Sequence, residues 1–160
     1  MTNRAEFLTS YFAAFKAGLV PLNINYRYTS SELAYLLDNA DAEAVVFHVQ
    51  YSSVIEDIRD RFDAVKIWVA VGTDGNCPGW AVAWEDVVAD MPAARPYRAP
   101  WGHDAEDFMM IYTGGTTGMP KGVMWRLADL IGRSNYMANP LLGTDPLAKP
   151  EDAGERAKAS

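Results

Sequence analysis

The sequence predicts an α/β fold with a mainly parallel sheet flanked by helices. Apolar positions recur at helical spacing in several segments, and short β-branched and aromatic runs lie between those segments. Strands separated by helices of this length need crossover connections, which make neighbouring strands parallel. The 160 residues suffice for a domain with its own core.

A first helix is predicted from Asn3 to Gly18. Asn3 and Glu6 have the spacing of a capping box, and the glycine ends the helical pattern. Aromatic residues recur on one face of this helix: Phe7, Tyr11, Phe12 and Phe15. Because a stripe at helical spacing usually packs into a core, we interpret it as core and not as a wall for an acyl group.

The following elements alternate as an α/β fold requires. Thr29 and Glu32 form a second capping box, which begins a helix expected to end near Asn39. The elements expected next are a strand at 44–48 covered on both faces, a helix at 54–62, a strand at 65–71 and a short helix at 84–91.

The second half holds the segment 112–125, which reads YTGGTTGMPKGVMW. A proline-rich surface connection leads to a strand at 107–113 that enters this segment, a strand at 122–125 leaves it, and a helix is expected at 126–138. The tail 144–160 is small and charged, so we expect it to be disordered and place the domain at 1–143.

Composition excludes several classes of function. The 14 basic and 21 acidic residues give a net charge of −7, which disfavours nucleic acid as a partner. The lone Cys77 excludes an intramolecular disulfide, and no metal site is predicted with only two histidines; we interpret His48 as structural. Without a secretory signal or a transmembrane segment, the expected location is a reducing cytoplasm.

The loop 113–121 contains the residue types that a phosphate-binding loop needs. Residues without Cβ let backbone N–H groups turn toward an anion, hydroxyl groups donate further hydrogen bonds, and a cation offsets charge. The predicted phosphate-binding residues are Thr113, Gly114, Gly115, Thr116, Thr117, Gly118 and Lys121.

Two general motifs do not explain this loop. The pattern G-x-x-x-x-G-K-[ST] fails because Pro120 precedes Lys121 and a glycine follows it. The pattern G-x-G-x-x-G fails because its second glycine would fall on Thr116. For a lone pair of glycines, a plain turn is the alternative interpretation.

The run YTGGTTGMPKGV resembles the signature of the adenylate-forming enzymes, usually written YTSGTTGxPKGV. Gly114 stands where serine is commonest, which removes one hydroxyl donor. A second region, 6–47, resembles the helix, strand and helix that precede this loop in acyl-CoA synthetases. The resemblance extends from residue 4 to residue 137 and implies part of the large N-terminal AMP-binding domain.

The resemblance also implies a reaction in two steps, as in the acyl-CoA ligases of fatty acid metabolism. A carboxylate attacks the α-phosphate of Mg²⁺-ATP to give acyl-adenylate and pyrophosphate, and coenzyme A then displaces AMP. The implied cofactors are ATP, Mg²⁺ and coenzyme A, with a carboxylic acid as substrate and the loop holding the ATP phosphates. Two alternatives stay open: an inactive nucleotide-binding or interaction remnant, and a piece of another adenylate-forming branch.

Four elements that the resemblance implies for catalysis have no counterpart in the sequence. They are the aromatic residue and glutamate of a Y-G-x-T-E type segment, the aspartate of a T-G-D type segment and a lysine near the C-terminus. Lys149 and Lys158 lie without matching context in the charged tail, so no catalytic residue is assigned. We expect an internal fragment that is inactive alone and that self-associates through uncovered strand edges.

Overall fold

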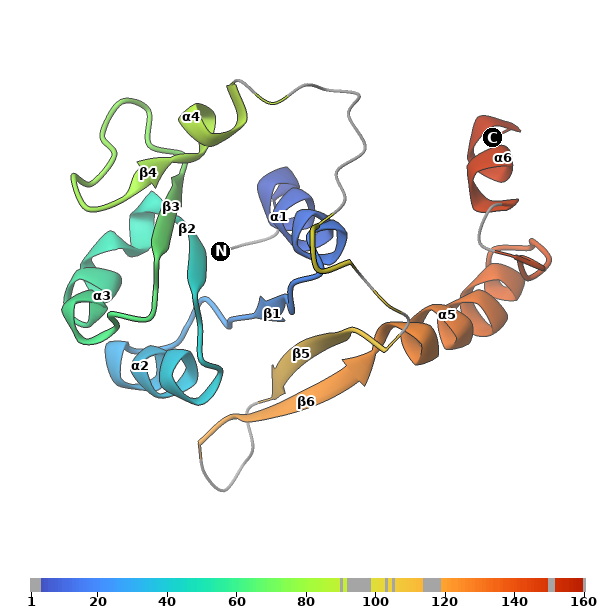
Figure 1. Cartoon of the computed structure of the whole chain (residues 1–160), viewed down its shortest axis with the longest axis horizontal. Coiled ribbons are helices and arrows are strands. Elements are labelled where there is room, and N and C mark those ends of the chain that lie inside the picture. The colour runs from blue at the N-terminus through green and yellow to red at the C-terminus, as the bar shows by residue number, and fades with distance from the viewer. Residues whose placement is uncertain are drawn as a thin grey trace.

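The computed structural model describes residues 4–89, 91, 99–102, 104, 106–113, 119–149 and 152–159. Within these ranges helices alternate with strands, which form one sheet of order β1-β5-β6 and another of order β2-β3-β4 (Figure 1). Three of the four strand pairings in the described ranges are parallel. The predicted α/β class with mainly parallel strands is therefore confirmed, although the strands are divided between two sheets.

The β2-β3-β4 sheet is parallel throughout. Strand β2 (Ala44–His48) pairs with β3 (Ile67–Val71), and β3 pairs with β4 (Val82–Ala83). The two longer strands lie where the sequence predicts them, whereas β4 was not predicted because two residues form no recognisable pattern. Strand β2 alternates between buried and more accessible positions, so the prediction that both of its faces are covered is wrong.

The β1-β5-β6 sheet contains the predicted loop. Strand β1 (Leu22–Asn23) pairs in parallel with β5 (Phe108–Thr113), which pairs in antiparallel fashion with β6 (Lys121–Arg126). All six residues of β6 are exposed. The predicted strands on either side of the loop are confirmed, and they form a hairpin.

Helix α2 (Ser30–Asn39) packs its apolar face against the β2-β3-β4 sheet. Its capping box is present: the Thr29 hydroxyl accepts from the Glu32 N–H at 3.4 Å, and the Glu32 carboxylate accepts from the Thr29 N–H at 2.9 Å. The Glu32 carboxylate also accepts a hydrogen bond from the Thr29 hydroxyl group at 2.9 Å, and the two bonds that it accepts from Thr29 lower the pKa of the Glu32 carboxyl group. The buried core residues around this helix are Leu33, Ala34, Leu36, Leu37, Val45, Phe47, Ile55, Ile58, Val65, Trp68 and Ala70.

The helix predicted at 54–62 is interrupted. Helix α3 (Ser52–Glu56) ends early, and a separate 3₁₀ turn, Arg59–Arg61, follows. Ile55 in α3 and Ile58, the N-cap of the 3₁₀ turn, are both 2% exposed. The apolar stripe therefore identifies the buried residues correctly but not the backbone that presents them.

Helix α1 (Ala5–Lys16) differs from the prediction in two ways. Its N-cap is Arg4, which makes no side-chain cap, and Asn3 lies outside the described residues. All of α1 is described, and none of its residues is buried; Phe12 is 63% exposed. The aromatic rings pack on one another, with 5.4 Å between the Tyr11 and Phe15 centroids. The interpretation of this stripe as core is therefore wrong.

At the end of α1, the backbone at Gly18 lies close to the backbone at Gly102. Gly18 adopts φ +63°, and the Leu19 N–H donates to the Ala14 carbonyl at 2.9 Å. The Trp101 indole donates to the Ala17 carbonyl at 2.8 Å, which ties the later connection to this helix. A Cβ added at Gly18 would lie 2.4 Å from the Gly102 carbonyl oxygen, so glycine is required here.

The remaining helices are α4 (Trp84–Ala89), α5 (Leu127–Leu141) and α6 (Asp152–Ala159). Figure 1 shows α5 and α6 extending away from the two sheets. Helices α4 and α5 confirm the predicted helices. Most of the proline-rich connection, 92–98, lies outside the described residues, and the domain boundary at 143 stays a prediction. Helix α6 lies within the tail 144–160, so the expectation that this tail is disordered is wrong for residues 152–159.

Substitution of Thr29 by alanine removes the hydroxyl group that caps α2. We expect the free energy of unfolding to fall by about 1 kcal/mol, because the Glu32 N–H loses its acceptor. Urea unfolding of the chain measures this loss. Ser53→Ala, which removes an exposed hydroxyl group from α3, is the matched control. Equal stability of the two variants would contradict the capping role.

Substitution of Gly18 by alanine combines backbone strain with a clash. We expect a loss of more than about 2 kcal/mol, since the left-handed conformation and the Gly102 carbonyl both oppose a Cβ. Gly75→Ala is the control, because Gly75 has φ +85° but an added Cβ meets no described atom within 4 Å. Thermal unfolding should separate the variants, with Gly75→Ala losing only about 1 kcal/mol.

Candidate functional site

Two of the predicted phosphate-binding residues lie in the described part of the chain. Thr113 is the last residue of β5 and Lys121 is the first residue of β6. The other predicted residues, Gly114, Gly115, Thr116, Thr117 and Gly118, lie outside the described residues. The site is therefore described from the two ends of the loop.

Thr113 and Lys121 face each other across the β5-β6 ladder. Side chains of directly opposite residues in an antiparallel pair project from the same face of the sheet. Both residues are exposed. The hydroxyl group and the ammonium group thus stand side by side at the base of the loop, where an anion held by the loop would meet both.

The opposite face of the hairpin is held by Tyr112. Its hydroxyl group donates a hydrogen bond to Asn39 Oδ1 at 2.8 Å, and its ring packs against the core around α2. Across the ladder lies Gly122, where an added Cβ would be 3.0 Å from the Tyr112 Cζ atom. Partial burial, and secondarily Tyr35 and Asp41, raises the pKa of Tyr112, so the phenol stays protonated and can donate.

The far end of β6 is fixed by charge. Arg126 donates to the Glu106 carboxylate at 2.8 Å and to the Asp129 carboxylate at 2.9 Å. The hydrogen bond from Arg126 lowers the pKa of the Asp129 carboxyl group. The Leu127 N–H also donates to the Asp107 carbonyl at 2.8 Å. These contacts join the end of β6 and the start of α5 to the segment before β5.

The sequence interpretation missed the contacts of Tyr112 and of Arg126. Tyr112 is hydrogen-bonded to a residue 73 positions away in the sequence, and no local sequence pattern reveals a contact between residues so far apart. Arg126 and Asp129 are three positions apart at a helix start, which is a recognisable ion-pair spacing. Glu106 also pairs with Arg126, but these two residues come close only when the β5-β6 hairpin forms.

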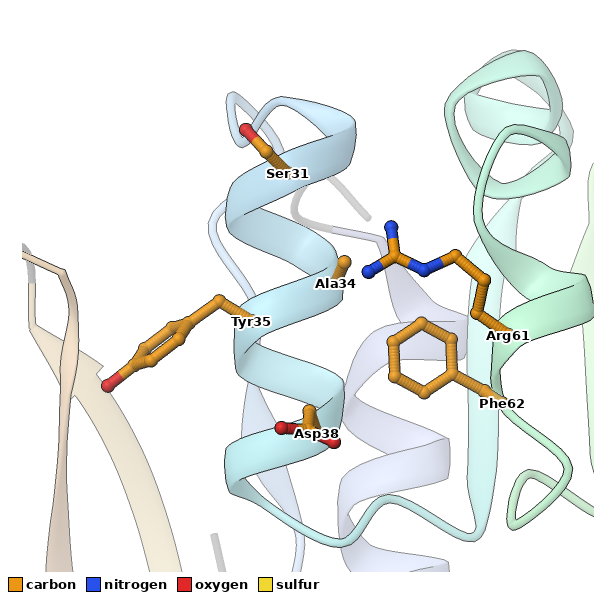
Figure 2. Close-up of a pocket in the computed structure, with 6 residues that line it drawn as sticks. All are labelled: Ser31, Ala34, Tyr35, Asp38, Arg61 and Phe62. Carbon is orange, nitrogen blue, oxygen red and sulfur yellow. The ribbon is translucent and has the colours of Figure 1, made fainter.

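A separate cleft of about 330 Å³ lies between α2 and the 3₁₀ turn after α3. Its lining residues are Ser31, Ala34, Tyr35, Asp38, Arg61 and Phe62. Figure 2 shows the Arg61 guanidinium group pointing toward α2, while Tyr35 points to the other side of that helix. Arg61 and Asp38 are both exposed, so solvent screens their charges.

The described histidine and cysteine have structural contacts. His48 Nδ1 accepts from the Gln50 N–H at 3.2 Å and so caps the 3₁₀ turn Val49–Tyr51. Burial, followed by the charges of Asp86 and Glu85, raises the pKa of the Cys77 thiol, which disfavours the reactive thiolate. No group of three or more His, Cys, Asp or Glu residues that could hold a metal occurs within the described ranges.

Comparison with known proteins identifies the family. A family model described as AMP-binding enzyme matches residues 1–148. The chain belongs to this family. The resemblance seen in the loop 113–121 and in the region before it is thereby confirmed.

The relatives of this AMP-binding chain include named acyl-CoA ligases. It is 33% identical over 157 residues to the medium-chain acyl-CoA ligase Mig of Mycobacterium avium, covering 97% of this chain and 28% of that protein. It is 35% identical over 142 residues to the 3-oxocholest-4-en-26-oate–CoA ligase of Rhodococcus rhodochrous, covering 84% and 25%. The chain thus spans about a quarter of the length of these relatives.

A solved structure supports the fold of this AMP-binding chain. The crystal structure of the anthranilate CoA ligase AuaEII in complex with anthranoyl-AMP matches with a TM-score of 0.75 and 26% identity. The match covers 84% of this chain and 25% of that one. In the described part of the chain, no helix has the length and apolar character needed to cross a bilayer.

Proposed function

We propose that this chain supplies the ATP-phosphate-binding hairpin of an AMP-forming acyl-CoA synthetase. The observation that supports the proposal most directly is the pairing of Thr113 with Lys121 at the base of a loop that has the family's signature. The loop residues Gly114, Gly115, Thr116, Thr117 and Gly118 would surround the β- and γ-phosphates. The Thr113 hydroxyl group would donate to a phosphate oxygen, and the Lys121 ammonium group would offset charge.

The reaction proposed for the complete enzyme has two displacements. A carboxylate oxygen of the substrate attacks the α-phosphorus of ATP, and pyrophosphate leaves with the electrons of the broken P–O bond. The coenzyme A thiol then attacks the acyl carbon, loses its proton and displaces AMP. Holding the leaving pyrophosphate in place and neutralising its charge lowers the barrier of the first step, which is the part assigned to this hairpin.

Magnesium is proposed to enter with the nucleotide. The described carboxylates do not gather into a group that could hold a metal. Magnesium commonly binds through substrate phosphates and retains several waters, so few protein ligands are needed. We therefore assign no metal ligand among the described residues and propose Mg²⁺-ATP as the form that the hairpin binds.

The substrate class is proposed from the named relatives. They are ligases for medium-chain acyl groups and for a sterol-derived acid, which share a carboxylate on an apolar body. The sequence offers no counterpart of the family's catalytic segments. Acyl activation is accordingly proposed for the longer enzyme, and phosphate binding for this chain.

Replacement of Lys121 by alanine should weaken Mg²⁺-ATP binding by roughly 10- to 100-fold, since a charged hydrogen bond contributes about 1.5–3 kcal/mol. Titration can be followed by tryptophan fluorescence, because Trp125, one of five tryptophans, lies on β6 and is 36% exposed. Lys158→Ala, which removes the same charge from α6, is the control. Equal affinities of the two variants would reject the role of Lys121, and no response of the wild-type chain at millimolar nucleotide would favour an inactive remnant.

Self-association is the second part of the proposal. Exposed apolar side chains gather on β6, on α5 and just after α5, at Met124, Ile131, Tyr136, Met137, Leu141 and Leu142. Because a contiguous exposed apolar surface marks an interaction site, we propose that a second copy of the chain covers this surface.

Sedimentation of the chain at micromolar concentration tests the proposed association. We expect a dimer, and we expect Ile131→Lys to shift the chain toward monomer because a charge in an apolar interface is costly to bury. Met91→Lys is the control, since Met91 is 68% exposed but lies just after α4. A monomeric wild-type chain, or an equal effect of both substitutions, would contradict this surface as the interface.

A further inference from the structure

One contact connects the proposed phosphate site with the core. Tyr112 immediately precedes Thr113 in β5, and Asn39 is the last residue of α2. The Tyr112 hydroxyl group donates to Asn39 Oδ1 at 2.8 Å. A single hydrogen bond therefore links the end of the core helix to the strand position next to the loop.

The same ring also spans the hairpin. Gly122 lies opposite Tyr112 in the ladder, and an added Cβ would be 3.0, 3.1 and 3.3 Å from the Cζ, Cε2 and Oη atoms of the ring. The tyrosine thus covers the strand position next to Lys121. Because a side chain at 122 would displace the ring, glycine is what allows Tyr112 to reach Asn39.

The two faces of the hairpin differ in their surroundings. On one face Tyr112 packs against the core; on the other, Thr113 and Lys121 are exposed. All residues of β6 are exposed, so pairing with β5 places the end of this strand next to the loop, while the contacts of Arg126 hold its far end. Any movement of Tyr112 relative to α2 would therefore move both ends of the loop.

We propose that Tyr112, Asn39 and Gly122 act together as a positioning device for the phosphate-binding loop. This inference rests on the proposed function of the loop. The ring and its hydrogen bond set the place of the hairpin base relative to α2, and thereby set where the Thr113 hydroxyl group and the Lys121 ammonium group meet the nucleotide. None of these three residues needs to touch the ligand.

Hydrogen exchange of the nucleotide-free chain provides the first test. Tyr112→Phe keeps the ring and removes the hydrogen bond, so exchange of a peptide covering 119–126 should accelerate roughly threefold to tenfold. A peptide covering β3 should exchange as in the wild-type chain. Tyr26→Phe, which removes a hydroxyl group at a 45% exposed position outside the hairpin, is the matched control. Unchanged exchange in 119–126, or equal acceleration in β3, would overturn the proposal.

Substitutions at Asn39 test whether this residue is the hydrogen-bond acceptor on which the position of Tyr112 depends. Asn39→Asp keeps an acceptor oxygen and should preserve slow exchange of the hairpin, whereas Asn39→Leu should reproduce the effect of Tyr112→Phe. The double variant Tyr112→Phe, Asn39→Leu should be no worse than either single variant, because both remove the same bond. If the two substitutions accelerated hairpin exchange additively, the two residues would act separately, and the proposed positioning role would be rejected.

Mg²⁺-ATP titration provides the last test and separates the two proposals. If the wild-type chain binds, Tyr112→Phe should weaken binding roughly threefold to tenfold, while Tyr26→Phe leaves it unchanged. Equal binding by the wild-type chain and Tyr112→Phe would overturn the positioning role. If the wild-type chain gives no response, the proposed phosphate binding fails, and the exchange measurements alone decide whether the contact positions the hairpin.

Discussion

The structure depends on the burial of one face of α2 against the parallel strands β2 and β3. Leu36 and Leu37 of this helix are 0% and 1% exposed, and Val71 at the end of β3 is fully buried. Burial of side chains of this size contributes about 1.5–3 kcal/mol each, which is large beside the net stability of a domain. The elements outside this core are held through a small number of contacts with it.

The hairpin β5-β6 is the clearest example of such dependence. Its strands pair with each other along their whole length, yet every residue of β6 is exposed. Tyr112 on one side and the ion pairs of Arg126 at the far end join it to neighbouring elements. A loop that binds a flexible, highly charged ligand benefits from rigid ends, because less ordering remains to be done when the ligand arrives.

Local chemistry decided which features could be predicted from the sequence. The capping box of Thr29 and Glu32 and the strand residues 67–71 are recognisable within a few residues, and they were predicted correctly. The aromatic stripe of α1 was interpreted as core because periodicity reveals an apolar face but not what covers it. In the candidate site, the ends of the loop were predicted, whereas the bond from Tyr112 to Asn39 joins distant segments and leaves no local pattern.

The pairing of β1 with β5 has a consequence for the order of folding. Leu22 is aligned with Met110, and the whole β2-β3-β4 sheet lies between them in the chain. Closing a loop of that length from an unfolded chain costs more entropy than closing the short loops between β2, β3 and β4. The intervening sheet shortens the effective loop once it has collapsed, so β1 should acquire its partner late. Nascent chains would then expose the β1 edge until β5 has been synthesised.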